Sequence, residues 1–341
     1  MKSKPEPELE PKSDPEPLPE PGLTPELGDL LKKHGYHIAG RHSAVKTCHW
    51  LNRALRGAGS CYKSQFYGIQ SHRCIQMTPT LACNHRCLHC WRPVEMPVPV
   101  PSPTSPDWDS PVEIKGSILR EHLRIISGYG GSETTDMDAL AYARKPNQVA
   151  ISLAGEPTLY PHLPELIDLY KKDGMTTFVV SNGTQPDMIA KISPTQLYLS
   201  LNAPDEETYL RVCNPHGNFW SEIQESLAVL GNSQSRSRSG SGSLIGAETG
   251  AGTRTAIRIT LIKGLNMHDC AGYARLLRVA NPDYIEVKAY MHVGFSRKRL
   301  SRDAMPEHSE VLSFASEISD IIGYRVADDS RISRVVLLSR S

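Results

Sequence analysis

Three cysteines lie close together in the segment QMTPTLACNHRCLHCWRP, where Cys83, Cys87 and Cys90 have the spacing C-x3-C-x2-C. Three thiolates in one loop can bind three irons of a [4Fe–4S] cluster and leave the fourth iron open. The amino and carboxylate groups of S-adenosylmethionine (SAM) can chelate that iron, and an electron from the cluster then cleaves SAM to a 5′-deoxyadenosyl radical. The alternative is a zinc site with His85 or His89 as a fourth ligand. The β/α pattern that follows the segment favours iron–sulfur.

A second set of cysteines precedes the first. Cys48, Cys61 and Cys74 are each thirteen residues apart, so spacing alone leaves open whether they are buried thiols or ligands that converge in space. Their number beside the first set favours a second [4Fe–4S] cluster, whose open iron could bind an α-keto acid. Lys63 and Lys46 each lie two residues from one of these cysteines. A lysine beside a cationic cluster can lose its proton and form an imine with a carbonyl, although a solvated surface lysine is the alternative.

The composition narrows the class of protein. The chain has 341 residues, a formal net charge of +1 and eight cysteines. No apolar run is long enough to span a bilayer, and the N-terminal segment lacks the apolar core of a secretory signal. We therefore expect a cytoplasmic enzyme whose cysteines serve metal or redox chemistry rather than disulfides. Cys213 and Cys270 stand apart from the others, and we interpret them as buried or incidental thiols.

A β/α alternation must position these residues. The strand candidates are short and rich in β-branched residues or Leu, as buried parallel strands are; they are Cys74–Thr78, Gln148–Leu153, Thr176–Ser181, Gln196–Leu201, Ala256–Ile262 and Tyr284–Ala289. Six β/α units predict a partial (β/α)6 barrel, with a last strand, Arg334–Ser339, extending the edge of the sheet. In such barrels the chemistry takes place at the C-terminal ends of the strands.

Polar residues follow three of the predicted strands at those ends. They are Gly155, Glu156, Asn182, Ser200 and Asn202. Gly155 would let the backbone approach a ligand, and Glu156 could accept a hydrogen bond from the SAM ammonium. Each residue alone is a weak signal, but together they predict a SAM site on one rim of the barrel.

The chain divides into segments of different composition. Residues 1–24 form a Pro/Glu-rich tail that we expect to be disordered. Residues 25–75 form an N-terminal extension, 76–300 the barrel and 301–341 a C-terminal extension. Within the barrel, residues 231–253 are rich in Ser and Gly, which predicts a flexible insertion.

From about Gly40 to Val293 the sequence resembles the archaeal tRNA 4-demethylwyosine synthases, which are radical SAM enzymes of the wyosine pathway. The matching stretches are GRHSAVKTCHW, CYKSQFYGIQSHRCIQMTPTLACNHRCLHCWRP, ISLAGEPTLYP, FVVSNGTQP, YLSLNAPDEETY, RITLIKGLNMHD and YIEVKAYMHVG. The arrangement of six cysteines is more specific than the first triad, which many radical SAM families share. The resemblance implies an α/β fold: a partial (β/α)6 radical SAM barrel with an N-terminal cluster-binding extension.

The resemblance also implies a reaction. A carbon–carbon lyase of this kind condenses N1-methylguanosine, 3′ of the anticodon of tRNA-Phe, with pyruvate. The radical takes a hydrogen from the N-methyl group, pyruvate C1 is lost, and the remaining two carbons close the third ring of 4-demethylwyosine. The implied cofactors are SAM and two [4Fe–4S] clusters, with pyruvate as cosubstrate.

The same resemblance assigns roles to residues. Cys83, Cys87 and Cys90 would bind the SAM cluster, and Cys48, Cys61 and Cys74 the auxiliary cluster. Lys63 would form the Schiff base with pyruvate, with Lys46 in reserve. The sequence departs from the family pattern at three positions, where it has His89, Asn202 and, in the CYK segment, Gln65.

The expected partners follow from the chemistry. The basic residues Arg297, Lys298, Arg299 and Arg302 follow the sixth strand and could hold the phosphates of tRNA-Phe, although a solvated loop is the alternative. We expect a monomer without membrane contact that takes electrons from an external donor of the flavodoxin or ferredoxin type. The alternatives are another radical SAM enzyme with an auxiliary cluster and a zinc-based RNA-binding module.

Overall fold

The computed structural model describes residues 23–237 and 252–340. The predicted disordered tail, except for its last two residues, and residues 238–251 of the predicted insertion lie outside the described residues. The first helix begins directly after the predicted tail, at Pro25, and the Thr24 hydroxyl caps it by accepting a hydrogen bond from the Leu27 amide. Among the described residues, no helix is both long enough and apolar enough to cross a membrane.

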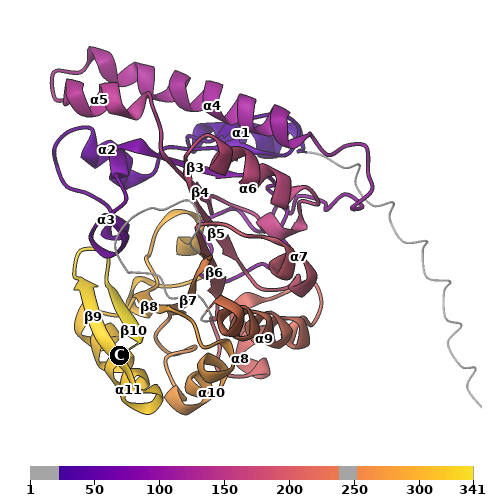
Figure 1. Cartoon of the computed structure of the whole chain (residues 1–341), viewed down its shortest axis with the longest axis vertical. Helices are drawn as coiled ribbons and strands as arrows, with labels where there is room; N and C mark the ends of the chain where they lie inside the picture. Colours follow the sequence, from indigo (N-terminus) through magenta and orange to yellow (C-terminus); the bar gives the residue numbers. More distant parts are fainter. Residues whose placement is uncertain (1–22, 238–251, 341) are drawn as a thin grey trace, which may run out of the picture.

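A ten-stranded sheet in the order β1-β2-β3-β4-β5-β6-β7-β8-β10-β9 forms the centre of the molecule (Figure 1). Its strands are β1 (His37–Ile38), β2 (Ala44–Val45), β3 (Cys74–Thr78), β4 (Gln148–Ile151), β5 (Thr176–Ser181), β6 (Gln196–Ser200), β7 (Arg254–Leu261), β8 (Tyr284–Ala289), β9 (Tyr324–Ser330) and β10 (Val335–Arg340). Strands β3 to β8 are parallel, and the outer strands pair antiparallel. The six parallel strands confirm the predicted partial (β/α)6 barrel. Strand β10 extends the sheet as expected, but the edge is β9, whose exposed polar residues provided no strand signal.

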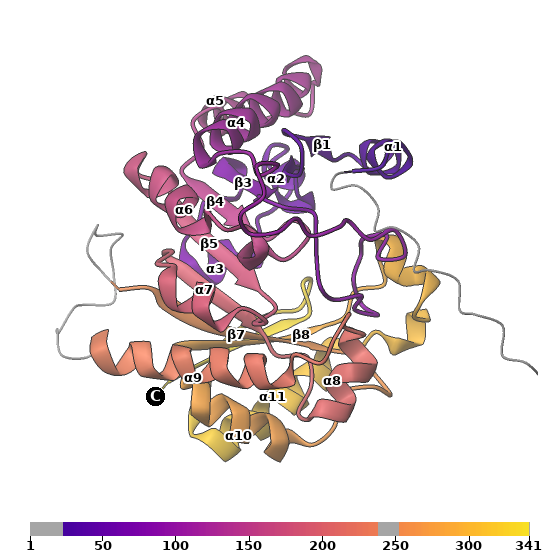
Figure 2. The ribbon, with the colours of Figure 1, turned by 90° about the vertical axis from the view of Figure 1, so that its right-hand side faces the viewer.

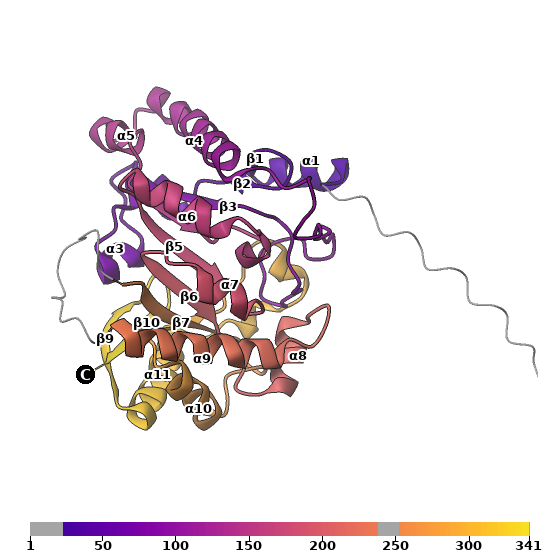
Figure 3. The same cartoon turned by 45° about the vertical axis from the view of Figure 1, so that its right-hand side comes forward.

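Eleven α-helices are found among the described residues. They are α1 (Pro25–Lys33), α2 (His49–Ala54), α3 (Tyr62–Tyr67), α4 (Pro111–Ser127), α5 (Met137–Ala143), α6 (Leu163–Lys172), α7 (Pro186–Lys191), α8 (Glu206–Cys213), α9 (Trp220–Ser237), α10 (Cys270–Ala280) and α11 (His308–Ile322). The outer helices cover the sheet in chain order, because α4 contacts α6, α7 contacts α9, and α10 contacts both α9 and α11 (Figure 2). In Figure 3, α3 lies at one end of the parallel strands and α8 near the other.

Helix α9 corrects one boundary of the predicted insertion. The helix continues to Ser237, so residues 231–237 are helical rather than an irregular loop. Gly231 lies against α10, where a Cβ atom would come within 2.3 Å of the Val279 carbonyl oxygen. This glycine therefore permits close packing of two helices, and the sequence analysis mistook it for the start of a linker.

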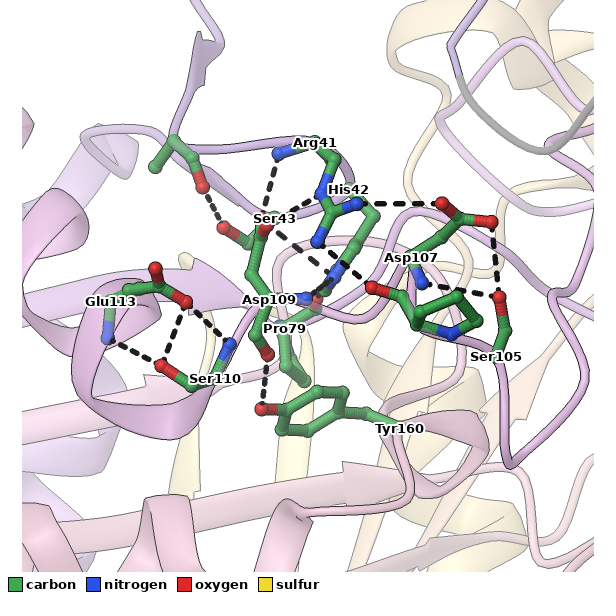
Figure 4. A network of polar contacts seen from close by, with 12 residues as sticks. Arg41, His42, Ser43, Pro79, Ser105, Asp107, Asp109, Ser110, Glu113 and Tyr160 are labelled. Carbon is green, nitrogen blue, oxygen red and sulfur yellow. Dashed lines mark hydrogen bonds and ion pairs between the residues drawn. The ribbon is translucent and has the colours of Figure 1, made fainter.

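A polar network joins the N-terminal extension to the barrel (Figure 4). The buried His42 ring donates from Nδ1 to the Pro79 carbonyl oxygen at 2.7 Å and accepts at Nε2 from the Asp109 amide at 2.8 Å. The Asp109 carboxylate accepts from the Arg41 guanidinium, and its carbonyl oxygen accepts from the Tyr160 hydroxyl. Both ring nitrogens are thus used by the neutral tautomer, and burial lowers the pKa of His42.

This network predicts a loss of stability in acid. The folded chain binds fewer protons at His42 than the unfolded chain, whose histidine titrates near about 6.5. The stabilisation is therefore present above that pH and is lost as the pH falls below it, with a slope of at most about 1.4 kcal/mol per pH unit. The His42→Gln variant has no titratable group at this position. Its free energy of urea unfolding should fall less than that of the wild type between about pH 7.5 and about pH 5.5, which lie on either side of about 6.5. His268→Gln at an exposed position is the control, and an unchanged pH dependence in His42→Gln would contradict the assignment.

Candidate active site

A cavity lies at the C-terminal ends of β3 to β6 and brings together the first triad and the predicted polar rim. Its lining includes Cys83, Cys87 and Cys90 together with Gly155, Glu156, Asn182, Ser200 and Asn202. The cysteines lie on the loop that follows β3, and the rim residues lie at or just beyond the ends of β4, β5 and β6. Residues widely separated in sequence therefore share one concave site, as the sequence analysis expected.

The loop that carries the first triad is held by Gly155. Its φ of +69° is left-handed, and a Cβ atom there would lie 2.1 Å from the Thr80 carbonyl oxygen and 2.7 Å from that of Ala82. The next amide, that of Glu156, donates to the Ala82 carbonyl oxygen at 2.8 Å. The sequence analysis attributed this glycine to the approach of a ligand, whereas the structure shows that it allows close approach of the protein's own cluster loop.

Side chains of the rim also brace one another. The buried Glu156 carboxylate accepts from the Thr158 amide and hydroxyl and, at 2.6 Å, from the Asn182 amide. Burial raises the pKa of Glu156. The Asn182 side chain donates to Asn84 on the cluster loop, and the Asn202 side chain accepts from the Thr260 amide. The Ser181 side chain also hydrogen-bonds this carboxylate, and together these donors oppose the effect of burial on its pKa.

An unpaired buried nitrogen of His89 bears on whether the cavity fits a cofactor. His89 lines the cavity, and its Nδ1 atom is buried without a hydrogen-bond partner among the described residues. Burial lowers the pKa of this histidine to about 4. A buried polar atom of this kind calls for a partner, and a nucleoside or amino acid group bound in the cavity would provide one. The cysteine donors and this unpaired nitrogen both fit a bound cluster with SAM.

The sequence analysis missed Cys213 as a member of this site. It ends α8, lines the cavity, and its sulfur lies within 4.8 Å of the donor atoms of His85 and Cys87. The His85 ring also forms a hydrogen bond of 2.9 Å with the Tyr209 hydroxyl. A lone cysteine on a helix has no spacing that could have marked it. By donor chemistry alone, the trio of His85, Cys87 and Cys213 could also hold zinc. Cys270 is buried, as predicted.

The second triad converges at the opposite end of β3. Cys48 and Cys61 are the N-caps of α2 and α3, where their sulfurs accept from the Leu51 and Lys63 amides, and Cys74 is the first residue of β3. Burial raises the pKa of Cys74, and the nearby thiols of Cys48 and Cys61 raise it further. Helix N-termini favour thiolates, so this donor set fits a metal cluster.

The two candidate lysines differ in their surroundings. The Lys63 ammonium nitrogen lies 4.8 Å from the centroid of the Tyr198 ring, on the strands, and its pKa is lowered by burial and by the charge of Arg258. Lys46 instead donates to the His34 carbonyl oxygen at 2.6 Å and lies over the Trp91 ring, beside the first triad. Only Lys63 thus combines proximity to the second triad with a position inside the barrel.

A buried ion pair holds α3 against the sheet, and the sequence analysis did not identify it. The Glu286 carboxylate on β8 is fully buried, pairs with Arg258 on β7 at 2.8 Å, and accepts hydrogen bonds from the hydroxyls of Tyr62 and Tyr67 on α3. Lys288 lies two residues further along β8, where burial lowers its pKa to about 8. Charged residues at alternate positions of a buried parallel strand, as in YIEVKAY, were the signal that could have revealed them.

The four basic residues predicted to contact tRNA divide into two groups. Arg297, Lys298 and Arg302 are exposed on the 3-10 helices η4 (Gly294–Lys298) and η5 (Arg302–Ala304). Arg299 points inward, and its guanidinium donates to the carbonyl oxygens of Leu88, Cys90 and Arg92 on the cluster loop. This orientation argues against a phosphate contact for Arg299.

Comparison with known proteins identifies the class. Residues 77–277 match the model of the radical SAM superfamily, and residues 279–340 match that of wyosine base formation. The chain is therefore a radical SAM protein, a class that uses SAM and a [4Fe–4S] cluster.

Individual relatives identify the family. The chain is 40% identical to the S-adenosyl-L-methionine-dependent tRNA 4-demethylwyosine synthase of Pyrococcus abyssi, covering 93% of this chain and 90% of that protein. It is 41% identical to the Methanocaldococcus jannaschii enzyme of the same name, covering 93% and 96%. A solved structure of TYW1 with a lysine-pyruvate adduct bound has 39% identity and a TM-score of 0.80, covering 93% and 96% of the two chains. The chain belongs to the tRNA 4-demethylwyosine synthase family.

The packing of Gly155 predicts a severe effect of Gly155→Ala. The methyl group would meet two carbonyl oxygens of the cluster loop in a left-handed conformation. Gly174→Ala is a matched control, because Gly174 has a φ of +74° but no atom within 4 Å of the added carbon. Left-handed strain alone should lower the free energy of unfolding by about 1–2 kcal/mol in the control, and overpacking should add about 1–3 kcal/mol in Gly155→Ala. Equal losses in urea unfolding would refute the contact.

Proposed function

We propose that this enzyme condenses N1-methylguanosine, 3′ of the anticodon of tRNA-Phe, with pyruvate to give 4-demethylwyosine. The observation that carries the proposal is the arrangement of two cysteine triads at opposite ends of β3, with Lys63 reaching the strand faces between them. Another radical SAM enzyme with an auxiliary cluster would not need a lysine at that place.

Cys83, Cys87 and Cys90 hold the SAM cluster in this proposal, and the rim residues orient SAM. When bound, the cluster and SAM supply a 5′-deoxyadenosyl radical that abstracts hydrogen from the N-methyl group. Glu156 would lie beside the SAM ammonium as its negatively charged partner, while Gly155, Asn182, Ser200 and Asn202 would shape the cavity around the ligand. An external flavodoxin- or ferredoxin-type protein supplies the electron.

Cys48, Cys61 and Cys74 hold the auxiliary cluster, and pyruvate binds beside it. The neutral amine of Lys63 attacks pyruvate C2 and water leaves, which gives an imine. The lowered pKa of Lys63 supports this role because only the neutral amine is a nucleophile. A lysine-pyruvate adduct is bound in the solved relative. Lys46 stays in reserve, although its contacts lie on the side of the first triad.

Product analysis with a Lys63 variant tests the function. Reconstituted enzyme with SAM, pyruvate, reductant and tRNA-Phe bearing N1-methylguanosine should yield 4-demethylwyosine on nucleoside analysis. Lys63→Arg should reduce turnover by at least about 100-fold, the lower range for loss of a positioned catalytic group, and borohydride should no longer attach labelled pyruvate to the protein. Lys46→Arg is the matched control and should keep both signals.

Other outcomes have a defined meaning. Label on a peptide with Lys46 would transfer the imine to that residue. Full turnover in Lys63→Arg would remove the imine at Lys63 from the mechanism. No 4-demethylwyosine from the wild-type enzyme with both clusters loaded would refute the proposed function.

The exposed cations Arg297, Lys298 and Arg302 are the proposed tRNA contacts, since the inward Arg299 is engaged. Replacing all three by Gln should weaken tRNA-Phe binding and reduce the slope of log K against log salt by about 0.7–0.9 for each phosphate that the protein no longer neutralises. Lys172→Gln, at an exposed position at the end of α6, is the control. Wild-type affinity and slope in the triple variant would place the tRNA elsewhere.

A further inference from the structure

The second half of the SAM-cluster loop, residues 88–92, is held by a segment that lies about two hundred positions later in the chain. The Phe295 amide donates to the Trp91 carbonyl oxygen at 3.1 Å. The preceding Gly294 has a φ of +58°, and a Cβ atom there would lie 2.5 Å from the same oxygen. The segment that contains η4 therefore packs backbone to backbone against the loop that carries Cys90.

Arg299 follows this short helix and makes most of the remaining contacts. Its Nε donates to the Leu88 carbonyl oxygen at 3.1 Å, and its Nη2 donates to the carbonyl oxygens of Cys90 and Arg92. Its Nη1 pairs with the Glu95 carboxylate. The Arg299 side chain is only 11% exposed, whereas that of Glu95 is 51% exposed, so its hydrogen bonds to the loop are better shielded from water than the ion pair.

The chemistry of the guanidinium suits this position. A planar fork with five donors can satisfy several acceptors at fixed angles, whereas a lysine ammonium is a point charge without that geometry. Loop carbonyl groups outside regular secondary structure need partners when they are buried. Arg299 supplies them for residues on both sides of Cys90, including Cys90 itself.

We propose that Arg299 is the positioning residue of the SAM cluster: its guanidinium fixes the backbone at Cys90 and thereby the direction of the third cluster thiolate. This proposal rests on the assignment of the first triad to the SAM cluster and does not depend on pyruvate or tRNA. Neighbouring η4 residues point their charges outward, so the same segment presents Arg297 and Lys298 to solvent and Arg299 to the loop. A fixed positive charge near a cluster also favours its reduced form.

The test uses single-cluster proteins, so that each cluster reports separately. In one background Cys48, Cys61 and Cys74 are replaced by Ala, and in the other Cys83, Cys87 and Cys90 are replaced. Arg299→Gln, Arg299→Lys and the control Arg297→Gln are introduced into both and reconstituted anaerobically. Iron per chain, the EPR spectrum of the reduced protein with and without SAM, and the midpoint potential are measured, with thermal melting by circular dichroism as the folding check.

Positioning by Arg299 predicts a selective effect. In the background that keeps the first triad, Arg299→Gln should lose at least half of its iron, weaken the SAM-induced change in the EPR spectrum and lower the potential. Arg299→Lys should lose iron to a similar extent, because it keeps the charge but not the fork. In the background that keeps the second triad, all variants should retain the same iron content.

Three results would overturn the proposal. The first is wild-type iron content, EPR spectrum and midpoint potential in Arg299→Gln. The second is equal loss of iron in both backgrounds, which indicates general destabilisation, and the third is wild-type iron content in Arg299→Lys, which indicates that charge alone suffices. If every protein that keeps only the second triad lacks iron, the assignment of an auxiliary cluster to that triad is refuted instead. The comparison within the first background then still stands, with the melting curves as its control.

Discussion

The pairing of β3 with its neighbours sets the distance between the two cysteine triads. Cys74 pairs with Gln148 at the start of β3, and Met77 pairs with Ile151 near its end. Four steps of about 3.3 Å separate the Cα atoms of Cys74 and Thr78, so the strand spans about 13 Å. A slip of one residue would turn Cys74 to the other face of the sheet. Because a paired strand has a fixed length, the register of β3 determines the positions of both cysteine triads relative to the sheet.

The other strands show how the two sites share one interior. Side chains two positions apart on a strand lie on the same face, about 7 Å apart. On β6, Tyr198 lies beneath the Lys63 ammonium nitrogen, and Ser200 lines the SAM cavity. On β5, Phe178 and Val180 have the same relation. The amine of Lys63 therefore lies about one pleat repeat below the cavity, and in the proposed function this spacing separates the imine from the radical.

The strands that carry this site could be predicted from the sequence more closely than the side-chain contacts that hold it. Strands β3, β5 and β8 have the predicted bounds, since their β-branched and apolar residues are typical of strands even where β8 also carries Glu286 and Lys288. Lys63 and Lys46 are equally far from a cysteine in sequence, but Lys63 lies within a helix capped by its cysteine, whereas Lys46 precedes a cap. That difference is local, but the place of the Lys63 amine over Tyr198 and the inward turn of Arg299 leave no local pattern. Both depend on partners more than a hundred residues away.

Burial and the charges around Lys63 explain why its pKa is lowered. Arg258, Lys288 and Lys63 lie near one buried carboxylate, that of Glu286. Glu286 is committed to Arg258 and to two tyrosine hydroxyls of α3, and removal of one partner from such a buried pair costs about 3–5 kcal/mol. The Arg258 charge therefore persists, and it adds to burial in lowering the pKa of Lys63 and of Lys288. A bound carboxylate such as that of pyruvate would offset the remaining positive charge. Arg258, one partner of the ion pair that holds α3 in place, thus also lowers the pKa of Lys63, the proposed nucleophile.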